Sequence, residues 1–580
     1  MRLTSRVAAV AILGLLTGPM AYAQATAQAG VQADQRLPES TFMYFSIPNV
    51  NTMKERMAKS HGSGMWTDPA FDEFKEELMN ALGGQFDEVK TELQENLGVT
   101  PMELLQIPSG QVTLAVSSVD DEFGLIAFID FGDSRRVVDG LMKKMAEAMD
   151  AEGVKMETED FSGTEISVFA IPGADNNPVA NSLHYCIRDT ELVISTNMAL
   201  MKNALSNWDG SDADTFSTNG NWAYVKERCG SGNANPAMAW FVDPIGLVND
   251  VLGSGMLPPQ AAAVGAFLPV LGLDKLNGMG GAMDMNVGKY DVISKTVYLC
   301  KDPSGVLKVM TLKEGDMTPP KWIPKAVAMY SGMNWDVSGA YKAVEDLVDS
   351  FGTPGEMASQ IDQMANQGPG IHIKNDIIDQ LTGKIQMVNG QGGGQEGAAG
   401  AAALLSPSMV IALGCKDEAA MNKLLTKLTE TAGFPGEVRE FRDSTIIEIP
   451  NPQGGPTMAL TVARGSLMFS TDVKLVEQLA RGGEESLVDS AAYKRVAAEF
   501  PAKAMALTFI DVKSSYKSMY ESFRDGDPAE MFPGMGEMLE NIDFSKLPKF
   551  DVLAKYMLPS GGYTVTDDRG AYSQTFTLKP

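Results

Sequence analysis

The stretch that decides the fold is Leu-Pro-Glu-Ser-Thr-Phe-Met-Tyr-Phe-Ser-Ile at residues 37–47, because a related stretch, Ile-Pro-Lys-Ala-Val-Ala-Met-Tyr, occurs at residues 323–330. In both copies an apolar residue and a proline precede a run of β-branched and apolar residues that contains a tyrosine, Tyr44 or Tyr330. Such a run, bounded by turn residues, is typical of a β-strand. One pair alone proves little, but it sets an offset at which the rest of the chain can be compared.

Seven further pairs of matching segments follow in the same order, each separated by roughly 270 to 285 positions, which indicates a duplicated unit. They are Gly110 and Gly383 ahead of strands, helices at 137–145 and 421–428, strand ends at 171–172 and 449–450, Ser-Thr pairs at 195–196 and 470–471, segments 216–225 and 487–496, strands 240–243 and 508–511, and strands 294–297 and 573–576. We therefore predict two homologous halves, residues 37–315 and 316–580, joined near Pro319 and Pro320.

Within each half, short strands alternate with amphipathic helices. Residues 164–171 and 183–187 are two strand-like runs that follow one another directly, which favours antiparallel hairpins over crossover units. Asp68-Pro69 is a typical helix start, an N-cap followed by proline in the first turn. The predicted fold class is therefore α+β, with a mostly antiparallel sheet in each half and helices covering one face of it.

The N-terminal residues have the three regions of a secretory signal peptide: Arg2 and Arg6, an apolar run at 7–16, and the small-residue site Ala21-Tyr22-Ala23. The apolar run is about half as long as a membrane-spanning helix, so residues 1–23 are expected to be cleaved off. The first cysteine is Cys186, so the sequence indicates no lipid anchor. We expect an exported protein, periplasmic or extracellular, without a transmembrane anchor. Residues 24–36, polar and rich in Ala and Gln, are predicted to be a flexible leader.

The composition is acidic, with 47 Lys and Arg against 74 Asp and Glu and a net charge of −27. Such an excess repels nucleic acid, so we expect no nucleic-acid partner, and the sequence leaves the actual partner unknown. The Gly- and Ala-rich tract at 390–403 is predicted to be a flexible loop. The four cysteines leave two alternatives open, one disulfide among the first three or buried free thiols: Cys186, Cys229, Cys300 and Cys415.

The sequence offers few groups for catalysis or metal binding. None of the three histidines, His61, His184 and His372, has a metal-ligand partner at helical spacing. Motifs of nucleophile elbows and phosphate-binding loops are absent from the sequence. We therefore predict no catalytic residue, no cofactor and no metal ligand.

Asp243 and Asp511 are the most interesting acidic residues, because each ends a matching strand and directly precedes a predicted helix. An N-cap needs that position, and this is one interpretation. The other is a pair of symmetry-related carboxylates that bind a ligand.

An apolar stretch at residues 251–273 has a far more polar counterpart at 520–543 in the second half. The asymmetry suggests a contact surface for a partner or a lipid, and buried packing between the halves is the alternative. The candidate contact residues are Met256, Leu257, Phe267 and Leu268.

Two motifs, Leu-Pro-Glu-Ser-Thr-Phe-Met-Tyr at 37–44 and Leu-Val-Ile-Ser-Thr at 192–196, resemble families of large secreted bacterial proteins of unknown function. The resemblance implies secretion and carries no activity. We expect an exported, non-enzymatic protein that is a binding or structural component of the periplasm or cell envelope. The alternative is a carboxylate-based hydrolase of unfamiliar type. A deep cleft holding two carboxylates, one with a raised pKa, would favour the hydrolase, and a shallow or apolar groove between the halves would favour binding.

Overall fold

The structure is a computed structural model. It describes residues 31–580 apart from 79, 81–93, 95–98, 121, 152, 172–181, 231–232, 234, 254–262, 368–369, 395–406, 431–433, 443, 452–456, 483–484 and 527–541. The predicted signal peptide therefore lies outside the described residues.

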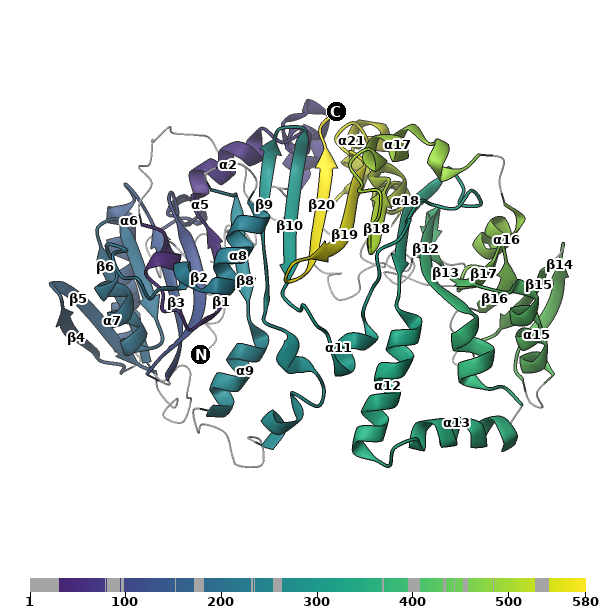
Figure 1. Ribbon diagram of the computed structural model, residues 1–580. Helices are drawn as coiled ribbons and strands as arrows, with labels where there is room; N and C mark the ends of the chain where they lie inside the picture. The colour runs from purple at the N-terminus through teal and green to yellow at the C-terminus, as the bar shows by residue number, and fades with distance from the viewer. Residues whose placement is uncertain are drawn as a thin grey trace. The chain divides into compact units, whose positions relative to one another are not determined.

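The chain forms two compact units (Figure 1). Unit 1 comprises Met1–Ser63, Leu82–Ala266 and Leu276–Leu299, and unit 2 comprises Gly64–Ala81, Phe267–Lys275 and Cys300–Pro580. Two short segments that lie in the first half of the sequence thus belong to the second compact unit.

In unit 1, ten described strands form a continuous antiparallel ladder. Their spatial order is β4 (Met156–Phe161), β5 (Thr164–Ala170), β6 (Ser182–Arg188), β7 (Glu191–Ser195), β3 (Glu122–Asp130), β2 (Val112–Val119), β1 (Thr41–Ile47), β8 (Met238–Val242), β9 (Met279–Val287) and β10 (Tyr290–Tyr298).

In unit 2, ten described strands form a second antiparallel ladder. Their spatial order is β14 (Glu437–Phe441), β15 (Ser444–Ile449), β16 (Met458–Ala463), β17 (Ser466–Ser470), β13 (Pro407–Cys415), β12 (Leu381–Gly394), β11 (Val327–Asn334), β18 (Ala506–Ile510), β19 (Ser560–Asp567) and β20 (Gly570–Leu578).

The two ladders connect their strands in the same order, since the β11–β20 arrangement repeats that of β1–β10. The segments that directly precede β1 and β11 also match. Pro38 forms an isolated bridge with Thr215, and Pro324 forms one with Ser486. The predicted α+β class with mostly antiparallel sheet is confirmed. The common order supports a duplicated unit, which stays a prediction.

Among the residues that the structure describes, unit 1 contains the helices α2 (Val50–Ala58), α5 (Pro101–Gln106), α6 (Arg135–Ala151), α7 (Met198–Ser206), α8 (Gly220–Cys229) and α9 (Pro244–Gly253). Those of unit 2 are α3 (Gly64–Thr67), α11 (Gly305–Val309), α12 (Val337–Phe351), α13 (Glu356–Gln367), α15 (Glu418–Thr429), α16 (Val473–Arg481), α17 (Ala491–Ala497), α18 (Val512–Asp525) and α21 (Phe550–Leu553).

In unit 1, helices lie on both faces of the sheet, whereas the sequence predicted one covered face. On β6, the Cys186 thiol lies 3.6 Å from the Met201 sulfur of α7. The next residue back, Tyr185, packs instead against the cluster that contains Val138 of α6. Neighbouring residues of a strand point to opposite faces, so α6 and α7 lie on opposite sides of the sheet.

The core on the α8 side of unit 1 is aromatic. The ring of Tyr44 lies 5.3 Å from that of Phe216 and 5.0 Å from that of Trp222. Trp222 also lies 6.2 Å from Phe241, and the matching pair of unit 2, Tyr493 and Phe509, has ring centroids 5.5 Å apart. Each buried side chain of this kind contributes about 1.5 to 3 kcal/mol relative to an exposed one.

Two segments predicted to be flexible are ordered in part. Ala33–Gln35 forms a short 3-10 helix, and both Ala33 and Arg36 are buried, so the end of the predicted leader belongs to unit 1. Residues 390–394 of the predicted flexible loop extend strand β12, where Gly394 pairs with Pro407. Residues 395–403 of that loop lie outside the described residues.

Residues 64–81 attach to unit 2 through specific contacts. Asp68 caps the helical turn at Pro69–Phe71, as the sequence pattern predicts, and also accepts a 2.8 Å hydrogen bond from the Tyr556 hydroxyl. Phe71 is buried in a cluster with Phe550 and Leu553 of α21.

Candidate apolar ligand site

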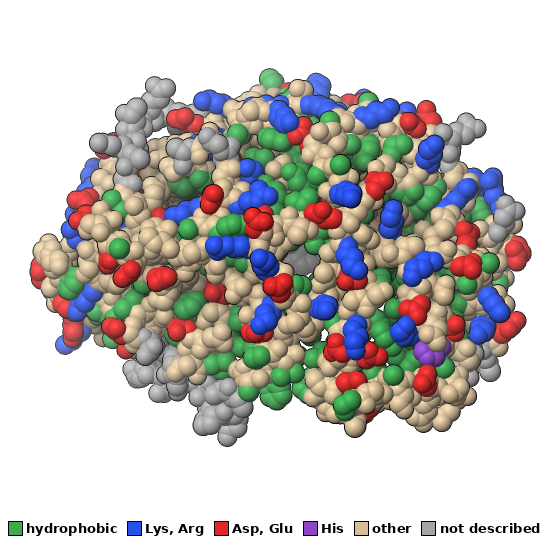
Figure 2. All heavy atoms as spheres, viewed as in Figure 1, with side chains coloured by type: hydrophobic (Ala, Val, Ile, Leu, Met, Phe, Trp, Pro, Cys, Tyr) green, Lys and Arg blue, Asp and Glu red, His purple; other side chains and the backbone are tan. Residues whose placement is uncertain are grey.

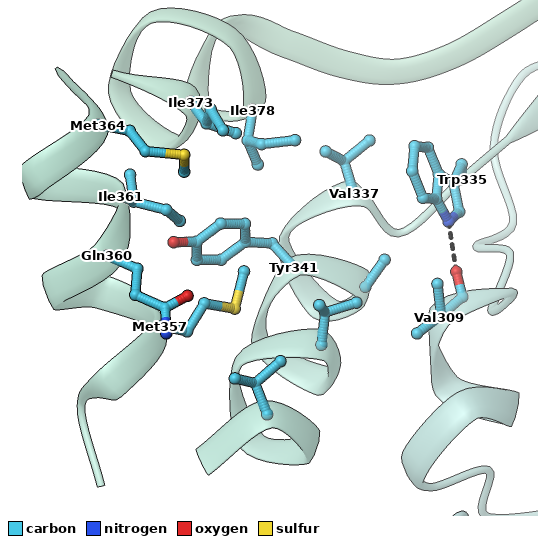
Figure 3. Close-up of a pocket in the computed structure, with 13 residues that line it drawn as sticks. Val309, Trp335, Val337, Tyr341, Met357, Gln360, Ile361, Met364, Ile373 and Ile378 are labelled. Atoms are coloured by element: carbon cyan, nitrogen blue, oxygen red, sulfur yellow. Dashed lines mark hydrogen bonds between the residues drawn. The ribbon is translucent and has the colours of Figure 1, made fainter. Parts of the chain in front are cut away.

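An apolar cavity of about 370 Å³ lies in unit 2 between α12, α13 and the helical turns that follow α13 (Figure 3). Trp335, Val309 of α11 and residues of these helices line it. The remaining lining residues are Val337, Ala340, Tyr341, Val344, Val348, Met357, Gln360, Ile361, Met364, Ile373 and Ile378. Cavities of this size are typical of small-molecule sites in proteins.

The cavity exists because two amphipathic helices face each other with their apolar sides. On α12 the lining residues recur three and four positions apart, as Val337, Tyr341, Val344 and Val348 do. Asp336 fixes the start of α12, since its carboxylate accepts a 3.0 Å hydrogen bond from the backbone N–H of Gly339. Such a cap contributes about 1 kcal/mol to helix stability.

The wall at Trp335 is held in place by a hydrogen bond. The indole N–H of Trp335 donates to the backbone carbonyl of Val309 at 2.6 Å, which satisfies the indole and leaves its ring as apolar surface (Figure 3). The two methionines of the α13 wall, Met357 and Met364, have flexible thioether side chains that adapt to irregular apolar ligands.

Tyr341 lies at the centre of the cavity, with its hydroxyl directed at α13 (Figure 3). Burial raises the pKa of this hydroxyl, and the nearby Glu345 carboxylate raises it further. The hydroxyl is therefore neutral at pH 7 and can donate or accept a hydrogen bond. The side-chain amide of Gln360 is the other polar group of the lining.

An exposed aromatic pair lies at the C-terminal end of α12. Phe351 is 61% exposed and its ring stacks on Phe267, which is 48% exposed, with centroids 6.3 Å apart. Phe267 is one of the four residues predicted as a contact surface. Leu268 is buried and therefore does not lie on the surface, while Met256 and Leu257 lie outside the described residues.

Asp243 and Asp511, the predicted ligand carboxylates, both lie at helix starts. Asp243 accepts a 2.7 Å hydrogen bond from the N–H of Gly246 at the start of α9. Asp511 accepts a 2.7 Å hydrogen bond from the hydroxyl of Ser514 at the start of α18. The contact of Asp243 is the one that the N-cap interpretation predicts, and the contact of Asp511 belongs to a related local turn.

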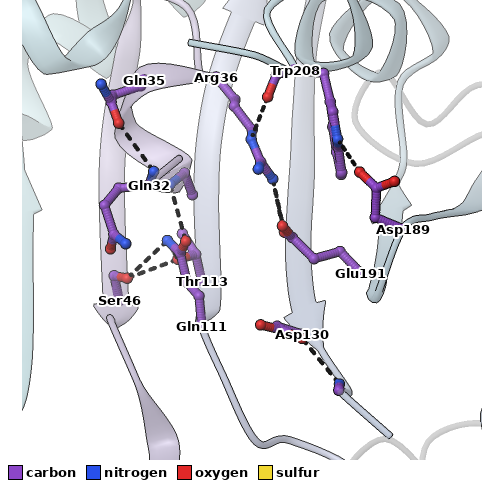
Figure 4. Close-up of polar contacts among 12 residues, drawn as sticks. Gln32, Gln35, Arg36, Ser46, Gln111, Thr113, Asp130, Asp189, Glu191 and Trp208 are labelled. Atoms are coloured by element: carbon purple, nitrogen blue, oxygen red, sulfur yellow. Dashed lines mark hydrogen bonds and ion pairs between the residues drawn. The ribbon is translucent and has the colours of Figure 1, made fainter. Parts of the chain in front are cut away.

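A buried ion pair ties the N-terminal segment to the sheet of unit 1 (Figure 4). Arg36 donates to both carboxylate oxygens of Glu191 at 2.8 Å, and its guanidinium lies 3.9 Å from the ring centroid of Trp208. Burial raises the pKa of Glu191, and the charge of Arg36 opposes that rise. Both carboxylate oxygens of Glu191 thus bond to Arg36, and the pair fixes the N-terminal segment to strand β7.

Other groups that could do chemistry are held in local contacts. The imidazole of His184 is buried, its pKa is lowered by that burial, and it lies within 3.2 Å of the Ser195 carbonyl. Cys186, Cys229, Cys300 and Cys415 are free thiols. Among the residues that the structure describes, no group of three or more His, Cys, Asp or Glu is placed to hold a metal ion.

A second apolar surface lies on the central strands of unit 1. Met43 and Phe45 of β1, Leu114 of β2 and Leu125 of β3 are between 37% and 51% exposed. They are neighbours on one face, because Phe45 pairs with Leu114, while Met43 and Leu125 both pair with Val116. Contiguous exposed apolar residues of this kind often mark a surface that another molecule covers.

The sequence did not reveal the cavity. Apolar residues recur at helical spacing in 337–348 and 357–364, and this pattern predicts two helices that each have one covered face. The pattern does not tell whether protein or a ligand covers that face.

Comparisons with known proteins add no identity. No model of a known protein family and no curated protein matches the sequence. Among solved structures, crystal form I of a protein named TP0453 aligns with a TM-score of 0.23 and 9% identity, over 48% of this chain and 81% of that chain. In the described part of the chain, no helix is long and apolar enough to cross a bilayer.

Proposed function

We propose that this chain is an exported, non-enzymatic binding protein and that the cavity between α12 and α13 holds the apolar part of a small ligand. The observation that carries the proposal is the cavity itself: about 370 Å³, lined by apolar side chains, with Gln360 and the Tyr341 hydroxyl as its polar groups. An apolar cavity of about 150 Å³ suffices for one benzene molecule, so this one suits a medium-length alkyl chain or a two-ring compound.

Three further features support binding over catalysis. The cavity has no carboxylate, thiol or imidazole among its lining residues. The buried Glu191 is neutralised by Arg36. The open apolar face on β1, β2 and β3 is a second surface of the kind that binding proteins use.

The test is titration of the purified protein with N-phenyl-1-naphthylamine, a neutral dye that becomes fluorescent in apolar surroundings. We expect saturable binding with one dye per chain. Substitution V344W places an indole inside the cavity and should weaken binding at least about tenfold, because the ligand and the new side chain compete for one volume.

Substitution V248W is the matched control, because Val248 is a helical valine of α9 that is 38% exposed and lies outside the cavity lining. It should leave dye affinity unchanged. M364W, at a lining residue that is 54% exposed, blocks the cavity with little risk to folding. Equal dye affinity for V344W, M364W and the unmodified protein would refute the proposed site.

A further inference from the structure

The charged side chains of the segment that builds the cavity are occupied by local contacts. Residues 336–380 contain eight carboxylates, and each forms an ion pair or accepts a hydrogen bond: Asp336 with Lys313, Glu345 and Asp346 with Lys342, Asp349 and Glu356 with backbone N–H groups, Asp362 and Asp376 with His372, and Asp379 with Lys374. Figure 2 shows acidic and basic side chains next to one another, with hydrophobic side chains between them, over the lower part of unit 2, where Figure 1 draws α12 and α13. None of these charged side chains is among the lining residues of the cavity.

Two hydrogen-bonding groups of the cavity lining can serve a ligand. The Tyr341 hydroxyl is directed at α13, and within the described residues it has no protein hydrogen-bond partner (Figure 3). The side-chain amide of Gln360 donates an N–H to the Glu356 carboxylate at 3.1 Å, which leaves the amide carbonyl to accept. Because both side chains line the cavity, the polar end of a bound ligand meets one hydroxyl and one amide carbonyl.

An uncharged polar group suits these two partners better than an ion. A ligand hydroxyl or primary amide can donate to the Gln360 carbonyl and also accept from the Tyr341 hydroxyl. An ammonium group cannot accept and a carboxylate cannot donate, so an ion can use only one of the two partners. An ion would also lose water on entry without meeting a counter-charge among the lining residues.

We propose that the ligand of this cavity is an uncharged amphiphile, an alkyl chain or ring system that carries a hydroxyl or primary amide group. Its apolar part fills the space between α12 and α13, and its polar group bonds to Tyr341 and Gln360. This inference rests on the proposed function and adds the polar group and the charge of the ligand.

The experiment compares four ligands with the same eight-carbon chain: 1-octanol, its methyl ether, octanoate and octyltrimethylammonium. Each competes with N-phenyl-1-naphthylamine at pH 8, where octanoate is ionised. We expect octanol to bind at least about tenfold more tightly than either ion, because the ions must give up more hydration. Octanol should also bind at least about threefold more tightly than the ether, which cannot donate a hydrogen bond. Apolar transfer alone would favour the ether, since it has more apolar surface.

A double substitution, Y341F with Q360L, tests the two polar partners. It should remove the preference for octanol over the ether while dye binding persists, because the apolar volume stays and both hydrogen bonds to the ligand are lost. The matched control is Y516F with Q363L, which makes the same changes at exposed positions of unit 2 outside the cavity lining. An unchanged preference in the cavity variant, or an equal loss in both variants, would overturn the assignment of selectivity to Tyr341 and Gln360.

The outcomes separate the two proposals. If the dye binds but the ether binds as tightly as octanol, or an ion binds tightest, the inferred polar group is wrong and the apolar site stands. If neither the dye nor any eight-carbon ligand binds, the proposed function fails as well.

Discussion

Removing Arg36 from its buried pair with Glu191 should destabilise unit 1 strongly at neutral pH. The side chains of Arg36 and Glu191 are 5% and 14% exposed, so substitution R36M leaves a carboxylate buried without a counter-charge. Breaking a buried pair on one side costs about 3 to 5 kcal/mol. Methionine keeps an apolar side chain against Trp208, so lost packing accounts for only a small part of the expected loss of stability.

The loss should depend on pH in a defined direction. Burial raises the pKa of Glu191 above its unfolded value, and the charge of Arg36 holds that rise in check. A carboxyl with a raised folded-state pKa contributes stability that is present below its unfolded pKa and lost as pH rises through its folded pKa. Without Arg36 the folded pKa rises further, so the difference between R36M and the unmodified protein should be largest near pH 7 and shrink towards pH 4.5.

Urea unfolding at pH 4.5, 5.5 and 7, followed by tryptophan fluorescence, measures this difference. The double variant R36M with E191M replaces both charges and should recover most of the loss, since apolar replacement of a whole buried pair is close to neutral. A cost below about 1 kcal/mol at pH 7, or the same cost at all three pH values, would refute the reasoning.

Two more predictions follow from the described contacts. Substitutions D243A and D511A should each lower the free energy of unfolding, by about 1 kcal/mol for the Asp243 cap, and should leave dye binding unchanged. If a variant instead loses ligand binding at full stability, the interpretation of Asp243 and Asp511 as paired ligand carboxylates is favoured. Burial raises the pKa of Cys186 to about 12, so iodoacetamide at pH 8.5 should label Cys186 far more slowly than Cys300 in the native protein. In urea the two cysteines should react at the same rate. Equal labelling rates in the native protein would contradict the burial of Cys186.

The sheets could be predicted from sequence because strand patterns are local. The alternation around Tyr44 and Tyr330 indicates which side chains face the core, and the order of matching segments along the chain predicts a duplicated unit. Burial of Arg36 could not be predicted, since its partner Glu191 lies 155 positions away and the surrounding composition is polar. Likewise, the apolar face of residues 64–81 indicates a buried helix but does not identify unit 2 as its partner.

The two units differ in the helix that follows the tyrosine strand, which is α2 in unit 1 and α12 in unit 2. The proposed site lies at this helix in unit 2. Helix α2 follows β1 as α12 follows β11, and Asn49 caps α2 as Asp336 caps α12. On α2, however, Arg56 forms a 2.8 Å ion pair with the buried carboxylate of Asp284.

Arg56 thus ties α2 to β9 by a charged contact, whereas α12 carries the valines and Tyr341 that line the cavity. Exchanging Val344 and Val348, two lining residues of α12 outside the buried core, for polar residues should abolish dye binding without disturbing the ladder of unit 2.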